Sequence, residues 1–305
     1  MDQIVIKKEF SVRRTELTCP AHSLKMMQKA ASSEADEVIL DLEDSCGLSQ
    51  KIDARKTLIE ALNTLDFKNK IRAFRPNNLR TKFFYRDLID VVEAAGPRID
   101  VVVIPKVQGA EDVLFVDRLL TQIEQNMGFE IGRIKLEVLI ESAKAVIHAY
   151  EIASSTPRMA GLIFGIADYA GDTGAKELTK EQFQVYHYPK SHTIAAARAA
   201  GIDVVDNVTL QFRDLDQCKV DAQKAAQIGF DGKWAIHPDQ LKIINGVFTP
   251  SAEELTRANE IMEAYRKADV DHGLGAIVYK DEMVDAATLR VEWKKLAIAK
   301  KIGLM

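Results

Sequence analysis

Short runs of apolar residues alternate with longer amphipathic segments along most of the chain. This alternation is typical of β-strands that are each followed by a helix, an arrangement that builds a parallel sheet. Eight runs have the length of strands: Thr15 to Cys19, Glu37 to Leu42, Lys70 to Phe74, Asp100 to Ile104, Lys135 to Ile140, Gly161 to Gly165, Ile202 to Val205 and Lys233 to Ile236. Because a closed (β/α)8 barrel needs eight strands, the pattern predicts an α/β fold of the TIM barrel class.

The segments between these runs have helical periodicity. In Gln50 to Leu65 and in Ala110 to Gln125, large apolar residues recur close to every 3.6 positions. Such helices bury one face, so we expect them to form the outer ring of the barrel.

The chain continues well beyond the eighth predicted strand. We predict a short helix from Asp239, a longer one from Ser251, where Glu254 has capping-box spacing, and a basic final segment from Leu289. The predicted domains are a catalytic barrel over residues 1–245 and a C-terminal helical arm over residues 246–305. The arm is expected to pack on a neighbouring subunit or to close over the barrel mouth, with His272-Gly273-Leu274-Gly275 as its hinge or linker.

Composition and charge disfavour several classes of protein. The 305 residues are 47% apolar and 28% charged, which is typical of a large folded domain. A net charge of −4 without a dense run of lysine and arginine argues against a nucleic-acid partner. There is no run of about 18 apolar residues and no secretory leader pattern, so we expect a cytoplasmic protein without a membrane partner.

The cysteine content disfavours a disulfide framework. Cys19, Cys46 and Cys218 are odd in number and lack the C-x-x-C spacing of zinc and redox sites. We therefore predict that all three are packing residues.

Charged side chains follow almost every predicted strand. In a (β/α)8 barrel the chemistry lies at the carboxyl ends of the strands, so these side chains are expected to converge there. They are Asp41, Glu43, Asp44, Arg75, Lys106, Glu141, Asp168, Asp206 and His237.

Converging carboxylates repel one another and are costly to desolvate without a cation, which indicates a divalent metal ion. Oxygen ligands without a companion cysteine favour Mg²⁺, with Mn²⁺ possible, over zinc. Glu141 and Asp168, which follow two clean apolar runs, are the predicted ligands. The alternative for each is a cap on the following helix.

Arg75 stands where a strand would open into the mouth of the barrel. Its planar guanidinium matches a carboxylate or a 2-oxo acid, and the alternative is an ion pair with Glu43 or Asp44. Glu43, Asp44, Lys106 and His237 are supporting candidates. The alternative for His237 is a hydrogen-bonded structural residue.

Several longer motifs occur in a characteristic order. They are VILDLEDS at 38–45, FFYRDLIDVVEAAGPRID at 83–100, VIPKV at 103–107, EVLIESA at 137–143, GIADYA at 165–170, GKWAIHPDQ at 232–240 and VFTPS at 247–251. Through them the chain resembles the citrate lyase β-subunit-like group of the HpcH/HpaI aldolase superfamily, and most closely its malyl-CoA and β-methylmalyl-CoA lyases.

The resemblance implies a (β/α)8 barrel with a C-terminal arm, Mg²⁺ on Glu141 and Asp168, and binding of the oxo acid by Arg75. The implied reaction is cleavage of a β-hydroxyacyl-CoA, such as malyl-CoA, β-methylmalyl-CoA or citramalyl-CoA, into an acyl-CoA and glyoxylate or pyruvate. The same reaction can run in reverse as a Claisen-like addition.

The resemblance also implies roles for residues outside the strand ends. Asp285 matches a carboxylate that moves the proton in a neighbouring subunit's site, and its alternative is the N-cap of the final helix. A residue that acts in a neighbouring subunit implies a homotrimer or a homohexamer. Arg14 matches a position near the turn that binds coenzyme A, and Lys25 and Lys29 would supply charge, although they are alternatively part of a solvated face.

The chain departs from the family pattern at three places that border the site. The first loop reads Cys19-Pro20-Ala21-His22, Pro76-Asn77-Asn78-Leu79 follows Arg75, and the insertion from Gly171 to His192 is short. Four alternatives therefore stay open: a lyase whose substrate lacks coenzyme A, a malyl-CoA thioesterase, a citrate lyase β-type subunit acting on a carrier-protein thioester, and a non-catalytic binding module.

Overall fold

A computed structural model describes residues 12–178, 180–272 and 275–305 and contains a closed barrel of eight parallel strands. Strand β1 pairs with both β2 and β8, and this double pairing closes the sheet. The strands are β1 (Thr15–Pro20), β2 (Glu37–Asp41), β3 (Ile71–Arg75), β4 (Val101–Ile104), β5 (Lys135–Ile140), β6 (Met159–Phe164), β7 (Asp203–Asp206) and β8 (Gly232–Ala235).

All eight predicted strands are confirmed, and so is the TIM barrel fold class. The observed ends lie within two residues of the predicted ones. The sixth strand, for example, begins at Met159 and not at Gly161.

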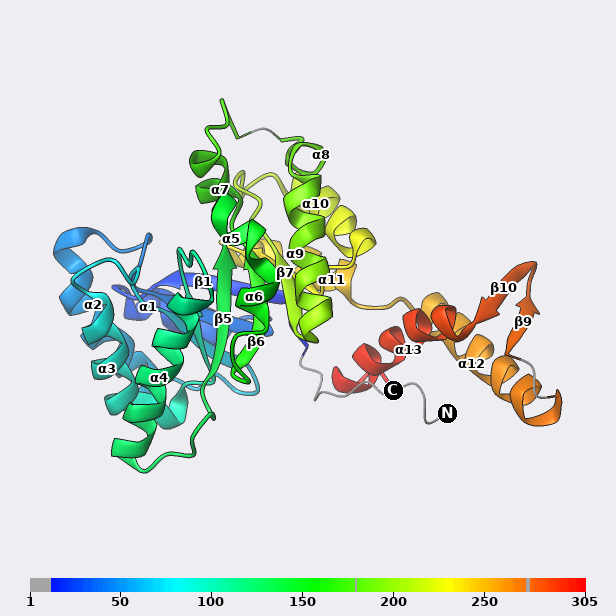
Figure 1. The fold of residues 1–305 in the computed structure, drawn as a ribbon, viewed down its shortest axis with the longest axis horizontal. Coiled ribbons are helices and arrows are strands. Elements are labelled where there is room, and N and C mark those ends of the chain that lie inside the picture. Colours follow the sequence, from blue (N-terminus) through cyan, green and yellow to red (C-terminus); the bar gives the residue numbers. More distant parts are fainter. Residues whose placement is uncertain (1–11, 179, 273–274) are drawn as a thin grey trace. The chain divides into compact units, whose positions relative to one another are not determined.

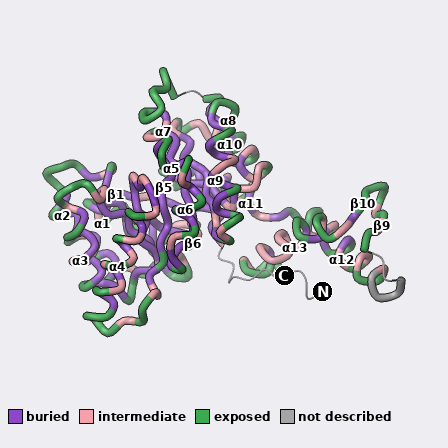
Figure 2. The backbone as a smooth tube through the Cα atoms, viewed as in Figure 1, coloured by how far each residue is buried: buried purple, intermediate pink, exposed green. Residues whose placement is uncertain are grey.

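Helices follow the strands and surround the sheet (Figure 1). They are α1 (Leu24–Ala31), α2 (Lys51–Thr64), α3 (Phe84–Ala95), α4 (Ala110–Met127), α5 (Ala143–Ile147), α6 (Ala149–Ala153), α7 (Ile166–Asp172), α8 (Gln182–Val185), α9 (His187–Ala200), α10 (Leu215–Ile228) and α11 (Leu241–Phe248). Short 3-10 turns are η1 (Leu48–Gln50), η2 (Gly96–Arg98) and η3 (Pro238–Gln240). The two helices predicted in detail correspond to α2 and α4, and Figure 2 shows buried strands within a partly exposed helical layer.

The barrel interior is filled with side chains from nearly every strand. Successive residues of a strand point to opposite faces, so every second residue faces inward. The buried inward layer consists of Ile39, Ala73, Val101, Val103, Leu139, Ile163, Val205, Val208 and Trp234. This apolar layer separates the carboxyl ends of the strands from their amino ends, and both ends carry charged residues.

Residues 13–245 form one compact unit, and residues 246–305 belong to a second. The second unit contains α12 (Ala252–His272), the strands β9 (Ala276–Tyr279) and β10 (Glu282–Asp285), and α13 (Ala286–Lys301). Its small core contains Ile261, Val284 and Leu289. The predicted capping box is confirmed, because Ser251 and Glu254 each accept a hydrogen bond from the other's backbone N–H.

The antiparallel hairpin of β9 and β10 was not predicted. Its turn places Lys280 and Asp281 at positive φ, where the Asn-Gly or Asp-Gly pairs that mark such turns are absent. Each strand has only four residues, too few for a clear alternation of apolar and polar positions. The predicted hinge includes residues 273–274, which lie outside the described residues.

Two simpler expectations can be compared with the structure. Cys19, Cys46 and Cys218 are buried and free, as predicted for packing residues. Among the described helices, none combines the length and the apolar character needed to cross a membrane.

A buried carboxylate fixes the connection that follows β3. Asp87 on α3 is fully buried and accepts hydrogen bonds from Nε and Nη2 of Arg55, at 2.9 and 2.7 Å. It also accepts from the backbone N–H and the side-chain amide of Asn77, at 3.0 and 2.6 Å. Asp87 therefore ties the segment after Arg75 to the helical layer.

We expect Asp87→Ala to lower the free energy of unfolding by roughly 3–5 kcal/mol, because it leaves a largely buried guanidinium with Asp90 as its remaining carboxylate partner and a buried amide without its acceptor. Urea unfolding would measure the loss. Asp53→Ala is the matched control, since Asp53 pairs with Lys56 while both side chains are at least 75% exposed. The control should change the free energy by no more than about 0.5 kcal/mol. Equal effects of the two variants would contradict the assigned role of Asp87.

Candidate active site

Two cavities lie at the carboxyl ends of the strands and share Glu141, Ala167 and Asp168. The larger has a volume of about 700 Å³ and is lined by polar groups that include Arg80 and Lys106. The smaller, of about 260 Å³, reaches down to Arg75 and Trp234. The structure thus brings together Arg75, Glu141 and Asp168, the three residues on which the predicted site depends.

Arg75 is held in place by two carboxylates. As the last residue of β3 it lies opposite Asp41 in the parallel register with β2, and its Nε and Nη2 donate to the two oxygens of Asp41 at 2.7 and 2.8 Å. Its Nη1 lies 3.3 Å from Glu43, and its guanidinium carbon lies 5.4 Å from the centre of the Trp234 ring. Of the two ion pairs considered for Arg75, the structure contains the one with Glu43 and not the one with Asp44.

This pairing sets the charges of both partners. Burial opposes ionisation of Asp41, but the Arg75 guanidinium outweighs it and lowers the pKa of Asp41 to about 2. Burial likewise opposes the charge of Arg75, yet Asp41 and Glu43 hold its pKa above the ordinary value. The site therefore contains a permanently positive guanidinium whose N–H groups are held in a fixed orientation.

Glu141 is a buried carboxylate with an unusually high proton affinity. It is 4% exposed, and its Oε1 accepts a hydrogen bond of 2.6 Å from the backbone N–H of Lys106. Burial, followed by the charges of Asp168 and Glu43, raises the pKa of Glu141 to about 8. A divalent cation beside these carboxylates would reverse that shift by favouring the ionised form.

Gly165 makes room for Glu141. It follows β6 and lies next to Glu141, since Ile140 and Phe164 are register partners. A Cβ at position 165 would lie 2.6 Å from the Cβ of Glu141 and 2.7 Å from its Oε2. Only glycine fits this close approach without displacing the carboxylate.

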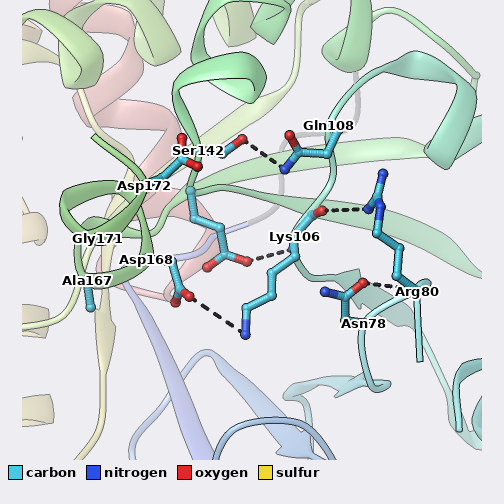
Figure 3. Close-up of a pocket in the computed structure, with 10 residues that line it drawn as sticks. Asn78, Arg80, Lys106, Gln108, Ser142, Ala167, Asp168, Gly171 and Asp172 are labelled. Atoms are coloured by element: carbon cyan, nitrogen blue, oxygen red, sulfur yellow. Dashed lines mark hydrogen bonds and ion pairs between the residues drawn. The ribbon is translucent and has the colours of Figure 1, made fainter. Parts of the chain in front are cut away.

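Lys106 places a cation among the remaining acids. Its Nζ lies 3.2 Å from Glu43 and 3.2 Å from Asp44. The same Nζ lies 3.7 Å from Asp168 (Figure 3). Its φ of +53° is in the left-handed region that side chains rarely adopt, and this conformation accompanies the hydrogen bond from its N–H to Glu141. Such strain is typical of functional sites.

The donor set fits Mg²⁺. Five carboxylates, those of Asp41, Glu43, Asp44, Glu141 and Asp168, face the two cations Arg75 and Lys106, so negative charge is in excess. Glu141 and Asp168 line both cavities and offer oxygen atoms, the ligands that Mg²⁺ prefers. The Asp168 side chain is 41% exposed, which leaves access for water and substrate.

Other predicted residues lie elsewhere. Arg14 precedes β1 and binds Asp36 through its backbone N–H, Nε and Nη2, at the end of the barrel opposite to the cavities. The expected contact of Arg14 with substrate is therefore not supported, because sequence proximity to the first loop is not spatial proximity across the length of a strand. Lys29 is exposed in the last turn of α1 and lines neither cavity.

His237 and Asp285 both act as helix caps. The Nδ1 of His237 accepts a hydrogen bond from the N–H of Asp239, and the ring stacks on Phe212, so the structural alternative for His237 is observed. Oδ1 of Asp285 accepts from the N–H groups of Ala287 and Thr288 at the start of α13. Asp285 belongs to the second unit, and these hydrogen bonds lower its pKa.

Sequence reasoning placed Asp41 among the strand-end charges but gave it no role in the site, and it did not single out Gly165. A signal for Asp41 was present, since the period of two places residues 41 and 43 on the same face of the chain as the inward Ile39. The signal for Gly165 was its position two residues after the inward Ile163.

Comparisons with known proteins agree with this geometry. A family model described as HpcH/HpaI aldolase/citrate lyase matches residues 14–238. An L-malyl-CoA/β-methylmalyl-CoA lyase of Cereibacter sphaeroides is 39% identical over 292 residues, covering 91% of each chain. A (3S)-malyl-CoA thioesterase of the same species is 34% identical and covers 95% of each chain.

A solved structure is also similar. The CitE protein of Mycobacterium tuberculosis, in complex with magnesium, acetoacetate and coenzyme A, has a TM-score of 0.77 and 27% sequence identity. The match covers 95% of this chain and 99% of that one.

We predict that Gly165→Ala weakens Mg²⁺ binding by at least about tenfold, because the added methyl group displaces Glu141. Isothermal titration calorimetry would measure the affinity. Gly171→Ala is the matched control, since a Cβ there meets no atom within 4 Å. Unchanged affinity in the Gly165 variant would show that Glu141 does not bind the metal in this position.

We also predict that, in EDTA, the folded protein loses stability as the pH rises from about 4.5, the ordinary pKa of glutamate, to about 8. In this window the folded state keeps a proton on Glu141 that the unfolded state releases, so the free energy of unfolding falls with increasing pH. Urea unfolding at several pH values would show a shallower fall for Glu141→Gln. Identical slopes would contradict the raised pKa.

Proposed function

Because the chain belongs to the HpcH/HpaI aldolase/citrate lyase family of enzymes, we propose that it is a Mg²⁺-dependent carbon–carbon lyase acting on a β-hydroxyacyl-CoA. The proposed substrates are malyl-CoA, β-methylmalyl-CoA and citramalyl-CoA, and the products are an acyl-CoA and a 2-oxo acid, glyoxylate or pyruvate. The observation that carries the proposal is the convergence of Glu141, Asp168 and Arg75 on the smaller cavity.

The smaller cavity suits the oxo-acid part of the substrate. Arg75 lines it beside both proposed metal ligands, and Asp41 and Glu43 fix the orientation of the guanidinium. A carboxylate that enters this cavity meets a planar cation that loses little freedom on binding. Glu141 and Asp168 would hold Mg²⁺, which supplies the Lewis acidity that stabilises negative charge developing on the substrate oxygen.

The larger cavity suits the thioester part. It contains about 700 Å³, and Asn78, Arg80 and Gln108 give it donors for amide and phosphate groups. Arg80 is itself oriented by the Lys106 carbonyl, 3.3 Å away (Figure 3), and by Asp112, also 3.3 Å away. The relatives named for malyl-CoA and the CitE complex with coenzyme A support this assignment.

We further propose that Asp285 moves the proton at the site of a neighbouring copy in a homotrimer or homohexamer. Its carboxylate is anionic at neutral pH, as a proton acceptor must be, and two backbone N–H groups that donate to it lower its pKa further. Oδ1 of Asp285 accepts both of these hydrogen bonds. An arm that packs on a neighbouring subunit, and a cytoplasmic location, belong to the same proposal.

A malyl-CoA thioesterase is the second candidate. The relative at 34% identity favours it, and the same Lewis acid can activate the thioester carbonyl toward water. The two reactions differ in product, since hydrolysis releases coenzyme A and malate without an oxo acid.

The test is incubation of the purified chain with Mg²⁺ and each of the three thioesters, with and without EDTA, while oxo acid and free coenzyme A are measured. We expect metal-dependent release of glyoxylate or pyruvate, reduced more than about a hundredfold in Asp168→Ala. Asp216→Ala, which removes an exposed acid on α10, is the control and should retain the activity of the unaltered chain.

Two outcomes would contradict the lyase assignment. Free coenzyme A without oxo acid would establish the thioesterase. Inactivity on all three thioesters would favour either a substrate without coenzyme A or a carrier-protein thioester, and co-purification with an acyl carrier protein would distinguish these two.

A further inference from the structure

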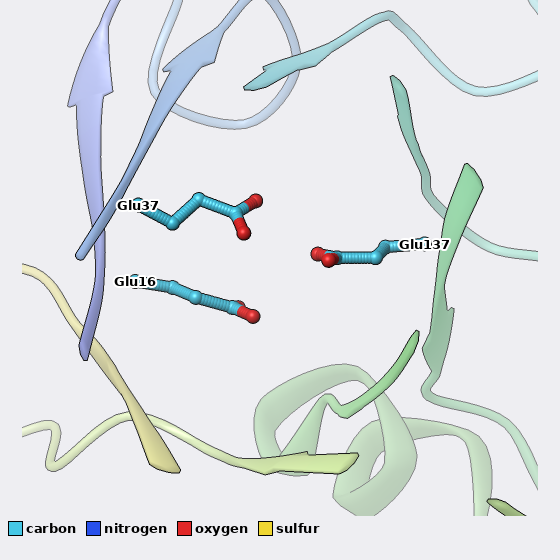
Figure 4. A group of neighbouring side chains, drawn as sticks. All are labelled: Glu16, Glu37 and Glu137. Carbon is cyan, nitrogen blue, oxygen red and sulfur yellow. The ribbon is translucent and has the colours of Figure 1, made fainter. Parts of the chain in front are cut away.

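Three glutamates meet near the amino ends of the strands, on the far side of the apolar layer from the cavities. Glu16 on β1, Glu37 on β2 and Glu137 on β5 are fully buried. One carboxylate oxygen of each lies within 4.8 Å of those of the other two, and Figure 4 shows the three groups pointing toward one another across the interior. The proposed lyase reaction uses none of them.

The strand register explains why they meet. Glu16 and Glu37 are direct partners in the parallel pairing of β1 and β2. Glu137 faces inward like Leu139, two residues further along β5, and it crosses the barrel to reach them. Gly161 on the adjacent β6 leaves room, since a Cβ there would lie 3.3 Å from the Cγ of Glu137.

Arg13 contacts this cluster, but its single positive charge does not neutralise the carboxylates around it. Nε of Arg13 lies 3.1 Å from Oε2 of Glu37 and 2.7 Å from Oε1 of Glu137, while its Nη1 pairs with Asp203. Four carboxylates thus face a single guanidinium. A buried excess of negative charge of this size requires a further positive charge or bound protons.

Glu16 provides an independent observation that points to a ligand. It is fully buried, and neither of its oxygens has a hydrogen-bond partner among the described residues. Oε1 of Glu37 and Oε2 of Glu137, the oxygens that Arg13 does not contact, lack partners as well. Each glutamate therefore offers a buried, unused oxygen, an arrangement that is costly unless something binds there.

We propose that Glu16, Glu37 and Glu137 form a closed site for a divalent cation, separate from the catalytic mouth. The all-oxygen donor set selects a hard ion such as Mg²⁺, Mn²⁺ or Ca²⁺ and disfavours zinc. Because the three side chains are inaccessible to solvent, the ion enters during folding and exchanges slowly, as in structural metal sites. It links β1 and β2 to β5 across the barrel.

The test uses Glu141→Gln as the background, so that the mouth does not contribute bound metal. This protein and its double variant with Glu16→Gln would be unfolded in guanidinium with EDTA, refolded in Mn²⁺, and dialysed against EDTA in the native state. Elemental analysis would then count the retained ion. We expect about one equivalent of Mn²⁺ in the Glu141→Gln protein and a loss of at least about tenfold in the double variant.

Thermal unfolding provides a second readout on the Glu141→Gln protein alone, in case the double variant does not fold. Refolding in Mn²⁺, Mg²⁺ or Ca²⁺ should raise the unfolding temperature above that of protein refolded in EDTA. Absence of retained ion and of any such rise with all three cations would overturn the proposal and show that the carboxyl groups hold protons. Retention that is equal with and without Glu16 would overturn it as well.

Discussion

The closed barrel places carboxylates in an interior with little water, and every such carboxylate needs a positive partner. At the mouth, Arg75 and Lys106 supply it for Asp41, Glu43 and Asp168. At the amino ends, Arg13 contacts the acids of β2, β5 and β7. The same electrostatic constraint therefore accounts for the fixed orientation of the Arg75 guanidinium, for the fit of a cation at the mouth and for the unsatisfied cluster at the amino ends of the strands.

Much of this arrangement could be predicted from residue order. The period of two identifies strands, and the rule that chemistry lies where parallel strands end identifies Arg75, Glu141 and Asp168 as neighbours. This prediction works because the position of a strand-end residue depends only on where its own strand stops. The hairpin of the second unit was not predicted because a Lys-Asp pair occupies its turn, where glycine is common.

Partnerships between strands could not be predicted in the same way. The contact of Arg75 with Asp41, and the meeting of Glu16, Glu37 and Glu137, depend on register across a closed sheet. Register follows from packing of the whole barrel and leaves no local mark on the sequence. Arg14 illustrates the same limit, since six residues of strand separate it from the loop that it was expected to serve.

The charge state of Lys106 determines whether its amine can react with a bound thioester. An unprotonated amine near a thioester can accept its acyl group. Lys106 lines the larger cavity, so the proposed thioester substrate could acylate it if the amine were neutral. Burial alone would favour the neutral, nucleophilic amine, but Glu43, Asp44 and Asp168 outweigh burial and keep the pKa of Lys106 above its ordinary value. With the thioester substrate proposed above, the acidic surroundings would keep this amine protonated and so prevent its acylation.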